Sequence, residues 1–209
     1  MEVRRIVAWL AALFGLGALL PRLIGAAFFD PHLMVAFAAM AVLFEAPVIC
    51  DAVSAGAGRV LPRATLGRHI AIAAGFGFAS AVLLMVIRTV ASNREIDAPY
   101  FLYPDPPVIG GLLLLALGFA IFGAAAGAWI TLHSYSPDVA RQRLRTGFLA
   151  FLLALILAAK FGPDGWRAAL TSLLTNDVIL TASAVLFALL AGASALLYRS
   201  AARHRQYSA

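Results

Sequence analysis

The amino-acid sequence predicts an all-α fold: a polytopic transmembrane helical bundle with six predicted spans and both chain ends in the cytoplasm (N-in/C-in). Of the 209 residues, 63% are hydrophobic and only 12% are charged. Soluble domains have roughly 45–50% apolar and about 25% charged residues, so a soluble chain of this length could not bury so much apolar surface. The apolar residues also form runs near the ~20 residues that a helix needs to cross the hydrocarbon core. Residues 1–209 are therefore interpreted as a single transmembrane domain.

The first two predicted spans cover residues 6–29 and 32–52. The first span follows two N-terminal arginines, so it also has the pattern of a secretory signal peptide. Arg22 stands between its apolar stretch and the small residues that would form a cleavage site, which favours an uncleaved helix. The second span starts after Asp30 and Pro31, a capping side chain followed by a proline suited to the first helical turn.

The remaining four predicted spans cover residues 68–90, 108–132, 146–162 and 178–198. The run at 108–132 is uncharged throughout and follows two prolines, which makes it the clearest span in the chain. The span at 146–162 is short, and it crosses the membrane only if Lys160 extends its ammonium group to the surface.

Basic residues set the orientation, because loops that stay in the cytoplasm are rich in arginine and lysine. Alternating the connections between six spans places most of the 16 basic residues on one side, which is therefore predicted to be cytoplasmic. That side holds Arg4, Arg5, Arg59, Arg63, Arg68, Arg141, Arg143, Arg145, Arg199, Arg203 and Arg205. The other side holds Arg22, Arg88, Arg94, Lys160 and Arg167.

Glu45 is the most informative polar residue, because it lies inside the second predicted span. A carboxylate at membrane depth costs a few kcal/mol on insertion scales, so it should face the bundle interior. Pro47 cannot donate a backbone hydrogen bond and should kink the same helix. His69 and His133 are predicted at a similar depth. We interpret these four residues as a polar intramembrane set on a transport pathway, or as a structural hydrogen bond between helices.

The sequence predicts no cofactor, no metal site and no catalytic residue. Haem in a helical bundle needs paired axial ligands at one depth, and of the four histidines only His69 and His133 are predicted to share one. Cys50 is the only cysteine, which excludes an internal disulfide. The chain has no phosphate-binding glycine loop, no HExxH and no GxSxG. Nothing in it therefore identifies an enzyme.

Two cationic side chains, Arg88 and Lys160, are predicted near the outer ends of the third and fifth spans. Both could extend to the membrane surface, or together they could contact an outer anion. Three arginines, Arg141, Arg143 and Arg145, are predicted in the connection between the fourth and fifth spans. Their charge suits anionic lipid headgroups.

Small residues predict where helices pack closely. Gly123 and Gly127 form a GxxxG motif in the fourth span, and Gly77 lies in a similar stripe of the third span. Small residues four apart allow two helix backbones to approach each other. The motif does not distinguish packing inside this chain from contact with another subunit.

Three functions fit these observations. The sequence favours a small permease or transport component with Glu45 on or near its pathway. The alternatives are an accessory subunit of a larger membrane complex without its own chemistry, and a membrane redox subunit that uses His69 and His133. The expected partners are the lipid bilayer, and other membrane subunits or further copies of this chain. Nucleic acid is not expected, because the arginines lie at the ends of apolar runs. The expected location is the cell membrane, as a multi-pass protein of a bacterial inner membrane.

Overall fold

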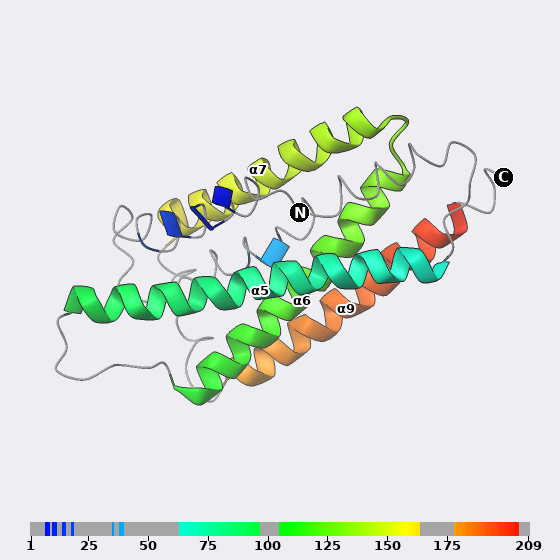
Figure 1. Cartoon of the computed structure of the whole chain (residues 1–209). Coiled ribbons are helices and arrows are strands. Elements are labelled where there is room, and N and C mark those ends of the chain that lie inside the picture. Colours follow the sequence, from blue (N-terminus) through cyan, green and yellow to red (C-terminus); the bar gives the residue numbers. More distant parts are fainter. Residues whose placement is uncertain are drawn as a thin grey trace.

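The computed structural model (Figure 1) describes residues 63–96, 105–163 and 178–204, together with scattered helical positions between Val7 and Ala39. Within these residues it contains helices and no strands. The long helices are α5 (Arg63–Ile96), α6 (Pro106–Leu132), α7 (Pro137–Phe161) and α9 (Ile179–His204). The predicted all-α class is confirmed for this part of the chain. The first two predicted spans fall largely outside it.

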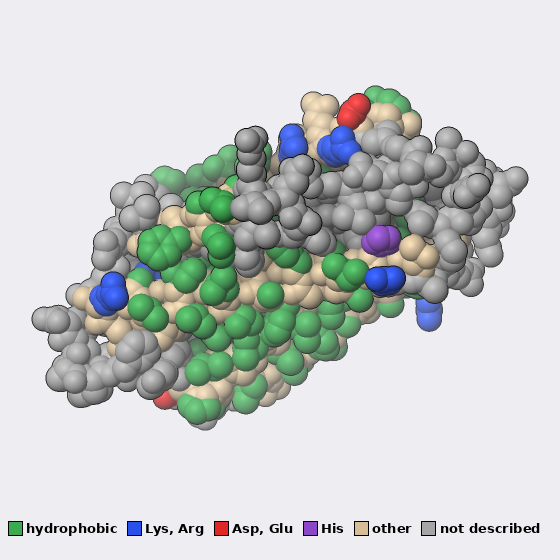
Figure 2. Space-filling model, in the orientation of Figure 1, with side chains coloured by type: hydrophobic (Ala, Val, Ile, Leu, Met, Phe, Trp, Pro, Cys, Tyr) green, Lys and Arg blue, Asp and Glu red, His purple; other side chains and the backbone are tan. Residues whose placement is uncertain are grey.

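Among the described residues, three helices are long and apolar enough to cross a membrane, over Thr65–Arg94, Pro106–Leu132 and Ile179–Ala202. The shortest of these segments has 24 residues, or about 36 Å at 1.5 Å per residue, which exceeds the ~30 Å hydrocarbon core. Figure 2 shows a band of apolar side chains over the helices on one face, with charged side chains toward the ends of the band. These features indicate a protein embedded in a membrane.

Each described helix is longer than its predicted span or shifted from it. The helix α5 begins at Arg63 and ends at Ile96, whereas the predicted span covers 68–90. The helix α7 begins at Pro137, so the three arginines predicted in a connection lie on a helix instead. The Ser136 hydroxyl caps this helix by accepting a hydrogen bond from the Val139 backbone N–H at 3.3 Å. Arginine is a good helix former, so the helix continues beyond the apolar run.

The helix α6 lies at the centre and packs against α5 in an antiparallel arrangement. Leu66, near the start of α5, shares a buried cluster with Ala128, near the end of α6. Leu84, farther along α5, shares a cluster with Leu112, near the start of α6. The buried residues in this contact are mostly alanine and leucine. The small side chains allow the two helix axes to lie close together.

The helix α9 packs against the other side of α6 and runs parallel to it. Ile179 at the start of α9 reaches the start of α6, where a Cβ added to Gly111 would stand 2.8 Å from Ile179 Cγ1. Ala201 near the end of α9 belongs to the same buried cluster as Ala128. Because α6 and α9 point the same way, the chain between them must return across the bundle, and α7 runs in that direction (Figure 1).

Trp129 joins the ends of α6 and α9. Its indole N–H donates a hydrogen bond to the Ser200 hydroxyl at 3.2 Å. Tyr198 packs in the same cluster, so these two aromatic residues lie at the same end of the bundle. Aromatic residues with a polar atom are enriched at membrane interfaces.

Candidate functional site

The polar residues predicted inside the membrane are only partly described. Glu45 and Pro47 lie outside the described residues, so their predicted role is untested. His69 is half-buried on the first turns of α5, and His133 follows the last residue of α6. Both histidines lie at the end of the bundle that holds Trp129, consistent with similar depth.

His133 closes the C-terminus of α6. Its backbone N–H donates to the Trp129 carbonyl oxygen at 3.1 Å, and its ring Nδ1 lies 2.8 Å from the same oxygen. A carbonyl oxygen only accepts, so this contact requires the proton on Nδ1. The ring also stacks on Trp129, with ring centroids 4.4 Å apart. These contacts give His133 a local capping role at the end of α6.

Among the described residues, no group of three or more His, Cys, Asp or Glu side chains lies close enough to hold a metal ion.

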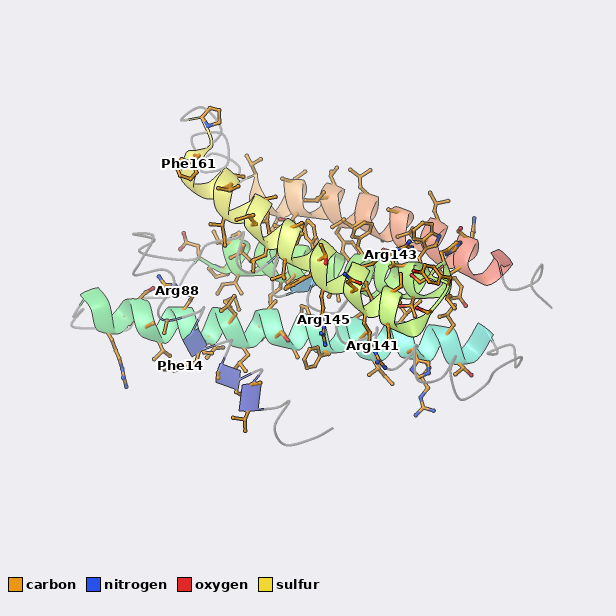
Figure 3. The ribbon with its side chains drawn as sticks, turned by 90° about the horizontal axis from the view of Figure 1, so that it is seen from above. Phe14, Arg88, Arg141, Arg143, Arg145 and Phe161 are labelled. Carbon is orange, nitrogen blue, oxygen red and sulfur yellow. The ribbon has the colours of Figure 1, made fainter. Side chains whose placement is uncertain are left out.

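Arg88 is almost completely buried, with 2% of its surface exposed. It lies on the buried face of α5, in line with Ser80, Leu84 and Ser92 at four-residue intervals. Figure 3 shows Arg88 near the end of α5 that leads into the connection with α6. A side chain extended into the aqueous surface would be exposed, so protein contacts and not snorkelling account for its position. Lys160, which was predicted to act together with Arg88, lies on the last turn of α7. Its side chain is not among those that the structure describes.

The glycines predicted to pack helices are all buried. Gly77 lies on the buried face of α5, and Gly123 and Gly127 lie on α6. A Cβ added to Gly123 would stand 3.2 Å from the carbonyl oxygen of Ala39 and 3.3 Å from its Cα. Gly123 therefore faces the backbone of another segment of the same chain.

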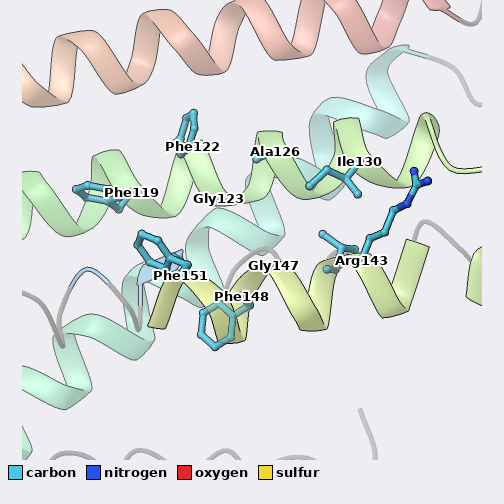
Figure 4. A pocket seen from close by; sticks show the side chains of 11 residues that line it. Phe119, Phe122, Gly123, Ala126, Ile130, Arg143, Gly147, Phe148 and Phe151 are labelled. Carbon is cyan, nitrogen blue, oxygen red and sulfur yellow. The ribbon is translucent and has the colours of Figure 1, made fainter. Parts of the chain in front are cut away.

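A cavity of about 170 Å³ lies between α6 and α7. Phe119 and Phe122 on α6 and Phe148 and Phe151 on α7 are among its lining residues, and Figure 4 shows Phe151 pointing from α7 toward α6. Gly147 stands beside them, and a Cβ added there would meet nothing within 4 Å. A larger side chain at position 147 would therefore extend into open space.

Among the described residues that line this cavity, Arg143 alone is charged. In Figure 4 it extends from α7 toward the end of α6, beyond Ile130. Residues two apart on a helix point to opposite sides, and Figure 3 shows Arg141 and Arg145 on the side of α7 away from Arg143. Arg141 contacts Asp138 at 3.6 Å. The three arginines therefore have different surroundings despite their even spacing.

This cavity was not predicted from the sequence. One signal was available: phenylalanines three residues apart occur on both helices, at 119 and 122 and at 148 and 151. Such pairs share a helix face. The pattern does not reveal that the two faces meet, because this depends on how α6 and α7 are rotated toward each other.

No family model, characterised protein or solved structure matches this chain. The function is therefore argued from its own residues and their arrangement.

Proposed function

We propose that this chain is a small membrane permease or transport component, with six spans, both ends in the cytoplasm and a location in a bacterial inner membrane. The observation that supports a transport role is Arg88, a guanidinium with 2% exposure on a helix long enough to span the membrane. Charged side chains within membrane spans are costly to insert, and such residues commonly mark substrate or ion pathways.

The direction of the helices supports the proposed number of spans. The parallel contacts between α6 and α9 require a return path between them. The helix α7 provides one, because its 25 residues measure about 37 Å at 1.5 Å per residue. We count α7 as a fourth crossing, and the apolar runs at 6–29 and 32–52 as two more.

The pathway would contain both signs of charge. Arg88 supplies a buried cation on α5, and Glu45 supplies a carboxylate in the second span. Opposite charges inside an apolar bundle suit a small anion whose movement is coupled to a proton. In this proposal Arg88 would attract the anion, and Glu45 would accept and release the proton.

Flux through purified protein in liposomes tests the proposal. Liposomes with an entrapped pH-sensitive dye would receive gradients of phosphate, sulfate or a dicarboxylate. The wild-type protein should move at least one of these anions together with protons. Arg88→Gln and Glu45→Gln should abolish this flux, whereas Arg88→Lys should retain part of it. Flux equal to that of protein-free liposomes for every anion would contradict a transport role.

Purification from native membranes in mild detergent separates the alternatives. Stoichiometric partner chains identified by mass spectrometry would indicate an accessory subunit. A visible chromophore would indicate a redox subunit using His69 and His133. A colourless protein without partners would favour the permease.

A further inference from the structure

We propose that the cavity between α6 and α7 binds one anionic phospholipid, with its phosphate on Arg143 and part of one acyl chain among the phenylalanines. The site differs from the proposed pathway, because Arg88 lies on α5 and does not line this cavity.

The shape and lining of the cavity fit a hydrocarbon chain. An apolar cavity of about 150 Å³ can hold benzene, so a volume of about 170 Å³ accommodates a segment of roughly six carbons. Phe119 and Phe151 lie at one end of the cleft, and Phe148 lies near its middle (Figure 4). None of the described residues that line the cavity is acidic.

The charge lies at one end of the cavity. Arg143 reaches past Ile130 toward the turn that connects α6 to α7, while the phenylalanines line the rest (Figure 4). A guanidinium binds a phosphate through two parallel N–H donors. A cation at one end of an apolar cleft matches a phospholipid, whose charged phosphate lies at one end of its acyl chains. A free phosphate would leave the apolar part of the cleft empty.

The position along the helices agrees with the depth of a headgroup. Arg143 lies in the second turn of α7, opposite Ile130, close to the bundle end that carries Trp129 and Tyr198. Phosphates lie at this level of a bilayer, next to the aromatic belt. The orientation proposed above assigns this end to the cytoplasmic leaflet. Lipid binding in detergent does not depend on that orientation or on transport, so the two proposals fail separately.

Native mass spectrometry of the purified protein tests this site, with phosphatidylglycerol and phosphatidylcholine as probes. The wild-type protein should retain one phosphatidylglycerol in preference to phosphatidylcholine. Arg143→Gln should weaken phosphatidylglycerol binding about fivefold, as expected for one arginine near a membrane surface. Arg145→Gln is the matched control, because it removes the same charge from the other side of α7. If both variants lose the same amount of phosphatidylglycerol binding, the lipid binds to a diffuse basic surface, and the proposed site is wrong.

A second pair of variants tests the acyl chain. Gly147→Leu places a side chain in the open space of the cavity and should reduce retention of both lipids. Gly192→Leu is its control, because a Cβ there also meets nothing within 4 Å and Gly192 lies on α9. Wild-type retention in Gly147→Leu would overturn the proposal.

Crosslinking gives a result that does not depend on the stability of these variants. A photoreactive amino acid at Phe148 should label phosphatidylglycerol in mixed liposomes more than phosphatidylcholine. The same group at Leu149, which is 62% exposed on the neighbouring position, should label both lipids in proportion to their abundance. Proportional labelling from Phe148 would contradict a specific site.

Discussion

Gly123 of α6 lies against the backbone of Ala39, whose carbonyl oxygen is 3.2 Å from the place where a Cβ on Gly123 would stand. Ala38, next to it, is fully buried in a cluster that includes Ala81 of α5 and Ala120 of α6. Ala38 and Ala39 therefore pack against α6, and residues of the same chain fill the space left by the missing side chain of Gly123.

Gly123→Ala should destabilise the protein by about 1–3 kcal/mol, the usual cost of adding a methyl group to a close-packed contact. Gly75→Ala is the control, because nothing lies within 4 Å of a Cβ at that helical position. Alanine there should stabilise the helix by roughly 0.5–1 kcal/mol. The free energy of unfolding of the two variants can be measured in mixed micelles. Equal stability of the two variants would mean that the contact with Ala39 is looser than observed.

The same contact changes how an accessory-subunit role should be tested. Loss of co-purifying partners in Gly123→Leu would be ambiguous, because the substitution disturbs packing inside this chain. Gly192 is a better probe of an external contact, since it is exposed on α9 and no atom lies within 4 Å of its added Cβ. If a partner packs on this face, Gly192→Leu should release it without lowering the stability of the isolated chain.

Gly111→Ala should be more destabilising than Gly110→Ala. A Cβ on Gly111 would stand 2.8 Å from Ile179 Cγ1, close to the α9 backbone, so α9 must shift. A Cβ on Gly110 would stand 3.3 Å from Leu180 Cδ2, the end of a flexible side chain that can turn away. The difference should reach about 1 kcal/mol or more, within the range for overpacking. Thermal unfolding of the two variants measures it, and a reversed order would contradict the parallel α6–α9 contact.

Removing the hydrogen bond between Trp129 and Ser200 should lower the free energy of unfolding by a small but measurable amount. Trp129→Phe removes the donor, and Ser200→Ala removes the acceptor. A double-mutant cycle should give a coupling of about 0.6 kcal/mol, the average for hydrogen bonds between membrane helices. A coupling near zero would show that water replaces the bond at the bundle end.

Cysteine labelling tests the proposed orientation. Cys50 is the only cysteine, so Cys50→Ala gives a background without thiols. Tyr135, 85% exposed in the turn between α6 and α7, is a suitable position for a new cysteine. Tyr135→Cys should react with an impermeant maleimide only after the cytoplasmic side is opened. A reporter after Ala209 should also read as cytoplasmic, and one inserted in the connection between Ile96 and Pro106 as external. The opposite pattern would reverse the assignment of leaflets.

The positions of the apolar helices could be predicted from the sequence, because a run of apolar residues is a direct requirement for crossing a bilayer. Their ends could not, since α7 begins among arginines that form helices well outside an apolar run. The total of six spans remains a prediction, because the first two predicted spans lie mostly outside the described residues.

Helix partners and the candidate sites were much harder to predict. A GxxxG motif marks a place for close packing but does not say which segment fills it, and only the structure pairs Gly123 with Ala39. Arg88 and Arg143 look alike in the sequence, each near the end of an apolar run. The rotation of their helices buries the first and places the second in a cavity.

The parallel pairing of α6 and α9 also affects how the protein is made. Neighbouring helices α5 and α6 can pair as a hairpin as soon as both have entered the membrane. The partner of Gly111 on α9 is synthesised about 70 residues later, which takes several seconds at roughly 5–20 residues per second. Until then, lipid must cover the small-residue surface of α6. Translation that stops between α7 and α9 would leave this surface permanently open, and such a truncated chain should be a substrate for membrane proteases.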